Sequence, residues 1–315
     1  MNPRVLVTGG AGFIGSHTVE ALLKTGRYDV RVLDNFATGH RSHLEHLAGD
    51  IELVEGDVRD METVEEAVSG IHAILHLAAL PSVPRSVKAP ITSNDVNAGG
   101  TLKLLSAAHR AGVSRVVLAS SSSIYGANAR LPKREDMLPA PVSPYAASKL
   151  AAEHYIGVFA RTYGMNTLAL RYFNVFGPRQ DPKSQYSGVI AKFMSRALGG
   201  EACTVCGDGT QSRDFTYVEN VVTANVATLE AAGLHGQAVN VACGVAFTVN
   251  DLLAEITAGI GIPVASVHEP TRTADVPHSL ADISAARALL GYEPRVGFTD
   301  GIVRTLAWYR EGTKQ

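Results

Sequence analysis

Short apolar runs alternate with longer segments of helical periodicity over about the first 170 residues of the chain. Apolar runs of this length are typical of strands buried on both faces, and the helical segments, such as His17–Thr25 and Thr101–Ala111, fill the gaps between them. Because strand–helix alternation implies right-handed crossovers, the pattern predicts an α/β fold, a Rossmann-type doubly wound parallel sheet. The expected strands are Arg4–Thr8, Val30–Leu33, Ile51–Val54, Ala73–His76 and Val116–Ala119.

The pattern loosens from about Gly177 onward, where glycine and proline become frequent and strands and helices no longer alternate strictly. We therefore expect residues 1–176 to form the sheet domain. Residues 177–315 are expected to form a smaller C-terminal substrate-binding region, parts of which can return to the first sheet.

Composition and charge narrow the class of protein. The chain has 315 residues, of which 46% are hydrophobic and 18% charged, with a net charge of -2. This balance is that of a globular protein and gives no indication of a nucleic-acid or anionic-membrane partner. No apolar stretch is long enough to span a bilayer, and the chain enters a strand at Arg4 without a signal-peptide pattern, so we expect a cytoplasmic protein.

The three cysteines raise the question of a metal or redox site. Cys203 and Cys206 have the spacing of a zinc half-site, but no second pair completes four ligands. The segment looks like a short strand, in which positions three apart point to opposite faces. We expect thiols that pack in the interior and no metal ion.

A glycine-rich turn follows the first expected strand, from Thr8 to Ser16. Glycine permits a tight turn and lets backbone N–H groups approach a pyrophosphate. Such a turn is a weak signal alone, but its position between the first strand and an amphipathic helix is the context that a dinucleotide site requires. The residues expected there are Gly9, Gly12, Phe13, Ile14 and Gly15.

Polar and small residues end the next strands. Asp34 can accept hydrogen bonds from both hydroxyls of an adenosine ribose and would repel a 2′-phosphate, which favours NAD over NADP; the alternative is a solvated carboxylate. Asp57 and Val58 follow the third strand at a height suited to adenine. The run His76–Ala79 lets the backbone lie close to a cofactor, and its histidine is expected to support the core instead of catalysing.

Tyr145 and Lys149 are four residues apart and share one face of an expected helix. A nearby ammonium and a positive nicotinamide ring would lower the pKa of the phenol and make it a general base near neutral pH. This spacing is common by chance. It gains weight here because it follows the fifth strand, which ends in the hydroxyl run Ser120–Ser123.

Together these motifs resemble the extended short-chain dehydrogenases/reductases, the NAD-dependent epimerase/dehydratase family, over nearly the whole chain. Within that family the chain is most similar to UDP-N-acetylhexosamine 4-epimerases of bacterial polysaccharide pathways, through Ser82–Ser86 and Arg171–Pro182. The other matching segments are Thr8–Ser16, Asp34, His76–Ala79, Ser120–Gly126, Ser143–Lys149, Arg171–Pro178, Gly207–Phe215 and Trp308–Tyr309.

The resemblance implies the roles of the site residues. Ser121 falls on the catalytic serine or threonine, Tyr145 on the base and Lys149 on the residue that binds the nicotinamide ribose. Sugar dehydratases of the family carry Asp and Glu where this chain has Ser122 and Ser123, and two hydroxyls cannot easily replace that acid/base pair. The further cofactor contacts that we expect are Asn35, Leu77, Ala78, Ala79, Asn97 and Tyr172.

The resemblance also implies a nucleotide-sugar site. Arg213 and Arg272 would hold the diphosphate with Asn174, and Asp275 the nucleoside, while Ser279 would line the hexose pocket. Pro81 and Ala274 stand where relatives tend to have glycine. The full set of expected substrate contacts is Ser82, Ser121, Ser122, Ser123, Asn174, Gln180, Arg213, Arg272, Asp275 and Ser279.

The implied reaction is epimerisation of a UDP-hexose at C4 through a 4-keto sugar with tightly bound NAD. The implied substrates are UDP-GlcNAc and UDP-GalNAc, with UDP-glucose and UDP-galactose as a further pair. The alternatives are a UDP-glucuronate 4-epimerase or decarboxylase, whose discriminating arginine would be Arg85 or Arg179, and a regulator that binds NAD without chemistry. By analogy with the family, we expect a homodimer formed through Asp95–Ala111 and Pro144–Tyr163.

Overall fold

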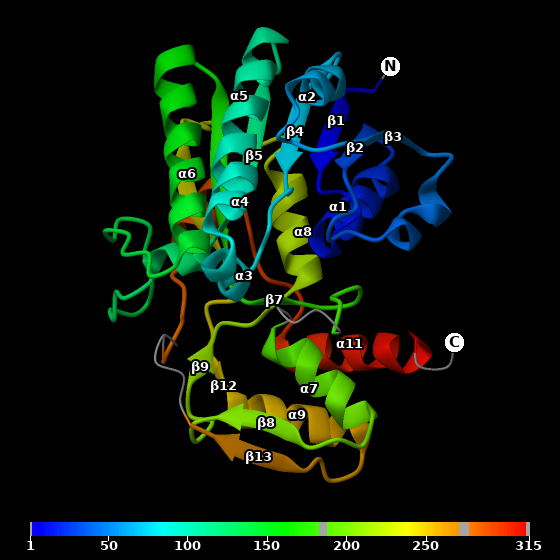
Figure 1. Ribbon diagram of the computed structural model, residues 1–315, viewed down its shortest axis with the longest axis vertical. Helices are drawn as coiled ribbons and strands as arrows, with labels where there is room; N and C mark the ends of the chain where they lie inside the picture. Colours follow the sequence, from blue (N-terminus) through cyan, green and yellow to red (C-terminus); the bar gives the residue numbers. More distant parts are fainter. Residues whose placement is uncertain (1, 183–187, 271–276, 313–315) are drawn as a thin grey trace.

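The protein is built on a seven-stranded sheet with helices on both faces (Figure 1). The computed structural model describes residues 2–182, 188–270 and 277–312. Every neighbouring pair in the sheet is parallel, in the order β11-β6-β5-β4-β1-β2-β3, so the predicted doubly wound sheet is confirmed. The strands are β1 (Arg4–Thr8), β2 (Asp29–Asp34), β3 (Ile51–Glu55), β4 (Ala73–His76), β5 (Arg115–Ser121), β6 (Asn166–Tyr172) and β11 (Gln237–Val241).

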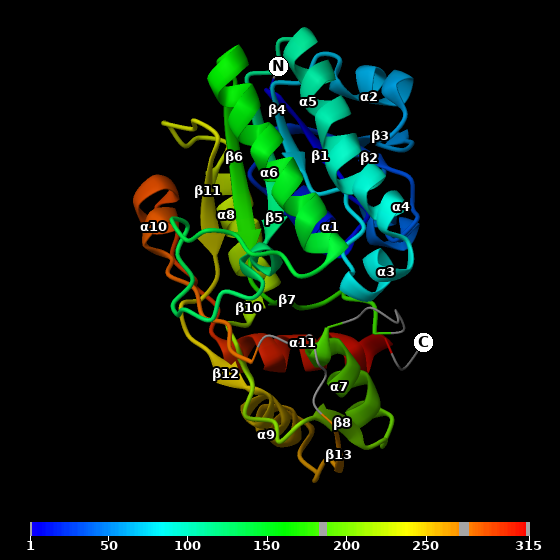
Figure 2. The same ribbon diagram turned by 60° about the vertical axis from the view of Figure 1, so that its left-hand side comes forward.

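Alternating side chains of the strands supply two hydrophobic cores. On one face, Val5 and Val7 pack in a core with residues of α1 (Phe13–Lys24) and α8 (Val218–Ala227). On the other face, Leu6 belongs to a core that includes α2 (Met61–Val68), α5 (Gly100–Arg110) and α6 (Pro144–Tyr163). Figure 2 shows α5 and α6 side by side over that second face. Since both faces are buried, the strands read as continuous apolar runs instead of alternating ones.

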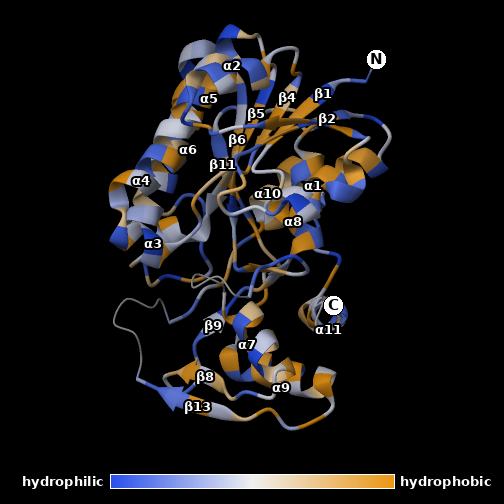
Figure 3. Ribbon diagram, turned by 45° about the vertical axis from the view of Figure 1, so that its right-hand side comes forward, coloured by the Kyte–Doolittle hydropathy of each residue, from blue (hydrophilic) through white to orange (hydrophobic). Residues whose placement is uncertain are grey.

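The remaining elements form a smaller lobe below the carboxyl ends of the strands, with its own core around Phe176, Leu252 and Leu306 (Figure 1). In Figure 3 the central strands are mostly hydrophobic, whereas β13 at the rim of this lobe is mostly hydrophilic, in keeping with its exposed residues. The elements of the lobe are β7 (Val175–Phe176), α7 (Val189–Leu198), β8 (Cys203–Cys206), β9 (Ser212–Arg213), β10 (Thr216–Tyr217), β12 (Phe247–Thr248), α9 (Val249–Ile260), β13 (Ser266–Glu269) and α11 (Phe298–Gly312).

The second half of the chain also contributes to the sheet domain. Its strand β11 pairs with β6 at the sheet edge, and α10 (Ser284–Leu290) packs beside β11. Two short helices, α3 (Val83–Lys88) and α4 (Pro90–Asn94), lead into the irregular turn Asp95–Gly99 and then into α5. None of the helices in the described ranges is long and apolar enough to cross a membrane.

Two element boundaries differ from the sequence expectation in ways that affect the site. The strand β5 continues two residues past Ala119, so Ser120 and Ser121 are strand residues paired with Arg171 and Tyr172 of β6. The helix α1 begins at Phe13, four residues before His17, directly at the glycine-rich turn. The predicted bounds of α6 agree with the structure.

The segment with Cys203 and Cys206 is the short strand β8, as predicted. The Cys203 side chain is fully buried beneath α7, with its Sγ 3.6 Å from the carbonyl oxygen of Phe193, while Cys206 is half-buried. The strand therefore places one of these thiols in the core of the smaller lobe.

Candidate active site

One large cavity of about 1320 Å³ lies where the carboxyl ends of the central strands meet the smaller lobe. This is the edge of a parallel sheet at which ligands bind in doubly wound folds. Of the residues predicted for the site, those that line the cavity are Gly9, Gly12, Phe13, Ile14, Gly15, Asp34, Asn35, Asp57, Val58, Leu77, Ala78, Ala79, Ser82, Ser121, Ser122, Ser123, Tyr145, Lys149, Tyr172, Asn174, Gln180, Arg213 and Ser279.

The glycine-rich turn is packed too tightly for side chains at two positions. Gly9 has φ +71°, and a Cβ there would lie 2.7 Å from the backbone nitrogen of Ala78 on the neighbouring loop. A Cβ at Gly15 would lie 2.0 Å from the carbonyl oxygen of Gly9. The turn is therefore a bare backbone cradle at the start of α1, which is the arrangement that a pyrophosphate requires.

Asp34 sits at the end of β2 and anchors that cradle. Its carboxylate accepts hydrogen bonds from the backbone nitrogens of Ala11 at 2.9 Å and of Phe36 at 2.8 Å. Burial raises the pKa of Asp34, and the two backbone N–H groups partly offset that effect. The side chain is thus both structural and available on the cavity wall for a diol.

The residues predicted beside the adenine lie together on the same wall. Asn35 donates its side-chain amide to Asp57 at 2.7 Å, and Arg59 donates from two nitrogens to the same carboxylate at 2.9 and 2.8 Å. Because of the Arg59 side chain, the pKa of Asp57 is lowered to about 2. Asp57 is therefore ionised at all ordinary pH values and fixes the geometry of this corner.

Two predicted polar residues stand behind the wall. His76 is buried between the hydroxyls of Thr8 at 2.7 Å and Thr101 at 3.0 Å, and burial lowers its pKa to about 3, so it is neutral. Asn97 accepts a hydrogen bond from the backbone nitrogen of Leu80 at 2.8 Å and donates to Ser148 at 3.0 Å. The predicted cofactor contact Asn97 does not line the cavity and acts on the wall through Leu80 instead.

The first turns of α6 carry the predicted catalytic pair. The helix begins at Pro144, capped by the Ser143 hydroxyl, which accepts a hydrogen bond from the backbone nitrogen of Ala146 at 3.2 Å. The phenol of Tyr145 lies beside Ser121, whose side chain favours its ionised form, and Lys149 donates to the carbonyl oxygen of Ala119 at 2.8 Å. The helix thus holds both groups against the carboxyl end of β5.

Burial governs the protonation of this pair. It raises the pKa of Tyr145, which the Ser121 side chain only partly offsets, and it lowers the pKa of Lys149 to about 8 against the opposing effect of Glu153. The sequence-based expectation of a lowered phenol pKa therefore does not hold for the protein residues alone. The ammonium of Lys149 donates to a backbone carbonyl. A lowered pKa of the Tyr145 phenol therefore requires further positive charge from a bound group.

The serines hold the loops around Tyr145. Ser121 caps the turn Ser122–Tyr125 by accepting from the backbone nitrogen of Ser123 at 3.2 Å, and the buried Ser123 hydroxyl has no partner among the described residues. Ser82 caps α3, accepting from Arg85 nitrogen at 3.0 Å. These hydroxyls converge on the part of the cavity beside Tyr145.

The smaller lobe supplies the opposite wall. Asn174, with φ +36°, donates to the carbonyl oxygen of Asp214 at 3.3 Å, and Arg213 donates to that of Pro277 at 3.0 Å. Ser279 is tied to β9 by its backbone nitrogen, which lies 3.0 Å from the carbonyl oxygen of Ser212. The predicted residues Arg272 and Asp275, and Ala274 with them, lie outside the described residues.

Some cavity residues were not predicted. Lys133, on the loop before α6, lines the cavity, and its backbone pairs with the segment after Ser279. No local sequence pattern predicts this pairing. Of the two candidate arginines, Arg85 lines the cavity, whereas Arg179 is ion-paired with Glu20 of α1. The resemblance had drawn attention to Arg85 without placing it.

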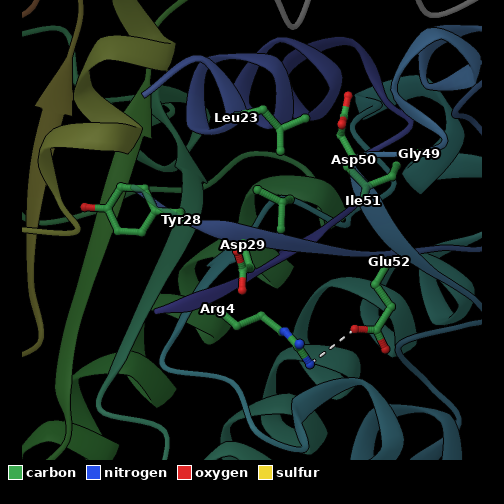
Figure 4. Close-up of a pocket in the computed structure, with 9 residues that line it drawn as sticks. Arg4, Leu23, Tyr28, Asp29, Gly49, Asp50, Ile51 and Glu52 are labelled. Carbon is green, nitrogen blue, oxygen red and sulfur yellow. Dashed lines mark ion pairs between the residues drawn. The ribbon is translucent and has the colours of Figure 1, made fainter. Parts of the chain in front are cut away.

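A second depression, of about 550 Å³, lies near the amino ends of β1 and β2 (Figure 4). Its charged groups include Asp29 and Asp50, and Arg4 forms an ion pair with Glu52 at 3.3 Å. No group of three or more potential metal ligands occurs in the described part of the chain. The residues with recognisable chemistry therefore gather in the larger cavity.

Comparison with known proteins agrees with this geometry. The model of the NAD dependent epimerase/dehydratase family matches residues 5–242. The chain belongs to this family. A UDP-glucose 4-epimerase from Mycolicibacterium smegmatis is 39% identical over 98% of both chains. The family and the NAD dependence that the sequence predicted are thereby confirmed.

Solved structures of the family match over the full chain. A UDP-N-acetylglucosamine 4-epimerase from Methanobrevibacter ruminantium, in complex with UDP-N-acetylmuramic acid, has a TM-score of 0.94 at 37% identity, covering 99% of each chain. A UDP-glucuronic acid 4-epimerase from Bacillus cereus, in complex with UDP-glucuronic acid and NAD, has a TM-score of 0.91 at 30% identity, covering 98% and 99%. The relatives are UDP-sugar 4-epimerases, which bears out the prediction of an isomerase.

Proposed function

We propose that this protein is a UDP-hexose 4-epimerase that interconverts UDP-GlcNAc and UDP-GalNAc. The observation that carries the proposal is that Ser121, Tyr145 and Lys149 lie together in a cavity that also holds a dinucleotide cradle. Ser122 and Ser123 stand where an acid/base pair would be needed to expel water. This arrangement favours reversible oxidation of one alcohol.

The chain's own residues fit NAD. Gly9 and Gly15 leave room for a pyrophosphate at the start of α1, and Asp34 offers a carboxylate to a ribose diol. Lys149 would hold the second ribose. NAD supplies the hydride acceptor and donor for C4 of the hexose, and since it is regenerated in each turnover, it should stay bound.

In this mechanism Ser121 and Tyr145 bind O4 of the hexose, and Tyr145 accepts its proton. The phenol is protonated near neutral pH in the residues' own environment, because burial raises its pKa. A positive charge beside it would favour the phenolate, so the base becomes effective only in the loaded site. After the 4-keto sugar has turned its other face, Tyr145 returns the proton.

The sugar can turn only if binding energy resides elsewhere in the substrate. Arg213, Asn174 and Gln180 lie on the wall opposite Tyr145 and are proposed to hold the nucleotide diphosphate, together with Arg272 and Asp275. Ser279 on the same wall is proposed to leave space for a 2-acetamido group.

A second candidate substrate is a UDP-uronate. The observation that favours it is the presence of Arg85 on the cavity wall, since a guanidinium can bind a C6 carboxylate bidentately. Pro81, on the same loop, also lines the cavity and stands where relatives tend to have glycine.

The test is incubation of the purified protein with UDP-GlcNAc, UDP-GalNAc, UDP-glucose, UDP-galactose and UDP-glucuronate, with products resolved by NMR. We expect interconversion of the two N-acetylated sugars. Turnover of UDP-glucuronate alone would replace the first candidate with the second, and no turnover of any of them would contradict a UDP-hexose 4-epimerase.

We also propose a homodimer formed through α5 and α6. The exposed side chains of α6 include Val158 and Tyr163, with 40% and 48% of their surface accessible. Apolar residues on an outer helix face are typical of a surface that another subunit covers. Light scattering on the purified protein would give the mass, and a monomer would contradict this assembly.

A further inference from the structure

A buried ion pair lies directly behind the catalytic pair. Glu153 is on the same helix as Tyr145 and Lys149, one turn beyond Lys149, so the three follow one another along α6. Its carboxylate accepts two hydrogen bonds from Arg171 of β6, at 3.0 Å and 2.9 Å. The side chains of Glu153 and Arg171 are only 7% and 6% exposed. A pair so deeply buried is costly to desolvate and is weak evidence of a purely stabilising role.

Glu153 also reaches the strand that carries the catalytic serine. The hydroxyl of Ser120 donates to Glu153 at 2.5 Å. Ser120 stands between Ala119, whose carbonyl accepts from Lys149, and Ser121, which lies beside Tyr145. The Glu153 carboxylate therefore holds Ser120, which lies between the residue that contacts Lys149 and the residue beside Tyr145.

The network extends from Arg171 to further buried side chains, and its members are hydrogen-bonded to one another. Arg171 donates to the phenol of Tyr125 at 2.9 Å, and Tyr125 donates to Asn240 of β11 at 2.7 Å. Ser120 and Arg171 are also direct neighbours in the pairing of β5 with β6. The carboxyl ends of three strands are thus joined through one set of buried side chains.

Charge adds a second effect. Burial lowers the pKa of Lys149 to about 8, and the negative charge of Glu153 opposes that loss. Of the other groups near Lys149, His76 is neutral because burial lowers its pKa to about 3, and Tyr145 is protonated. Glu153 is therefore the carboxylate that favours the charged form of Lys149.

We propose that Glu153 is a positioning residue for the epimerase site, which it serves by holding the end of β5 through Ser120 and by keeping the ammonium of Lys149 charged. Arg171 neutralises the carboxylate so that it can remain ionised in the interior. The inference rests on the proposed function for its kinetic consequences, whereas its electrostatic part can be measured without turnover.

The first experiment follows protein stability. Since the pKa of Lys149 is lowered on folding, the unfolded chain binds more protons between about pH 8 and the ordinary lysine value, and stability rises with pH across that window. The difference in Tm between the protein and its Lys149→Met variant isolates this contribution. When the same comparison is made in proteins that also carry Glu153→Gln, the pH range over which stability rises should begin roughly one pH unit lower.

Three further variants separate the two effects. Glu153→Gln/Arg171→Met replaces the pair without leaving a lone buried charge. If Glu153→Gln folds poorly, this double variant should still show a downward shift, which is smaller because the positive charge of Arg171 is lost as well. Ser120→Ala removes the tether but keeps the charge, so the window should not move. Glu135→Gln, a half-buried carboxylate that accepts from the backbone of Asn240, is the matched control and should also leave the window unmoved.

The second experiment follows turnover of the best UDP-sugar. We expect the alkaline limb of kcat/KM to shift to lower pH in each charge-removing variant by as much as the Tm window shifts in that variant, and Ser120→Ala to lose several-fold in kcat with an unshifted limb. The proposal would be overturned in favour of a structural ion pair if the charge-removing variants lowered Tm equally at all pH values. In that case neither the pH range of the Lys149 contribution nor the alkaline limb of kcat/KM would move. Failure of every UDP-sugar to react, with the Tm window still shifted, would overturn the proposed function and leave the role of Glu153 at Lys149 standing.

Discussion

The phenol of Tyr145, in the first turn of α6, lies beside the hydroxyl of Ser121, the last residue of β5. The two residues come from different elements, and each is held by a helix or turn cap. A substrate alcohol placed between them would therefore meet both groups. The Ser121 side chain also opposes, without cancelling, the effect of burial on the pKa of the phenol.

The first prediction concerns this phenol. Tyr145→Phe keeps the ring but removes the proton acceptor, and loss of a general base typically costs on the order of 10²–10⁴-fold in rate. We expect that fall in kcat on the best UDP-sugar. Tyr163→Phe, on the exposed end of the same helix, is the control and should keep wild-type turnover. Wild-type kcat in Tyr145→Phe would exclude Tyr145 as the base.

Local sequence patterns predicted those parts of the site that are built from single loops or helices. The glycine-rich turn, Asp34 at the end of β2 and the Tyr145–Lys149 spacing on α6 are all set within one strand–turn–helix unit. Their positions follow from the strand order, because the carboxyl ends of parallel strands share one edge.

Long-range relationships could not be predicted in this way. Glu153 reads as an ordinary polar helix residue until the register of β5 and β6 places Arg171 beside Ser120. Lys133 lines the cavity only because its loop pairs with residues after Ser279. The raised pKa of Tyr145 in the protein's own environment could not be predicted either, since the degree of burial is a property of the packed structure.

The second prediction concerns the cofactor. Protein purified without added nucleotide should carry NAD and not NADP, since the carboxylate of Asp34 would repel a 2′-phosphate. Denaturation followed by mass spectrometry of the released nucleotide is the measurement. Asp34→Asn should lower the NAD content, whereas Asp29→Asn, at the exposed start of β2, should not. Mostly NADP in the wild type would contradict the role given to Asp34.

The third prediction concerns Asp214, which the sequence did not single out. Its fully buried carboxylate accepts from the backbone nitrogens of Cys243 at 2.9 Å, Gly244 at 2.9 Å and Ala281 at 3.2 Å, and so ties the loop after Ser279 to the end of β11. Burial raises its pKa to about 6 in spite of these bonds.

The folded state therefore binds the Asp214 proton more tightly than the unfolded chain, and the stability that this proton provides is lost as pH rises from about 4 to about 6. Relative to Asp214→Asn, the wild type should lose about 3 kcal/mol of unfolding free energy over that range and then stay level. Urea unfolding at several pH values measures this. The difference in unfolding free energy between wild type and the exposed control Asp50→Asn should stay constant with pH, and a constant difference for Asp214→Asn would refute the buried-carboxylate account.

The last prediction concerns the choice of hexose. Ser279 lines the cavity on the wall opposite Tyr145, and its backbone is fixed by a hydrogen bond to Ser212. A tyrosine ring at this position would fill the space proposed for the acetamido group without altering the catalytic pair. Because overpacking penalises the larger ligand first, Ser279→Tyr should lose most of its activity on UDP-GlcNAc and UDP-GalNAc while retaining UDP-glucose and UDP-galactose turnover.

Two comparisons make this last experiment decisive. The first is kcat/KM for both sugar pairs in wild type and Ser279→Tyr, and the second is the same ratio in Ser279→Ala, which removes the hydroxyl without filling the space. We expect Ser279→Ala to keep the wild-type ratio. An equal fall for both sugar pairs in Ser279→Tyr would indicate general damage to the pocket, and an unchanged ratio would show that Ser279 does not select the hexose.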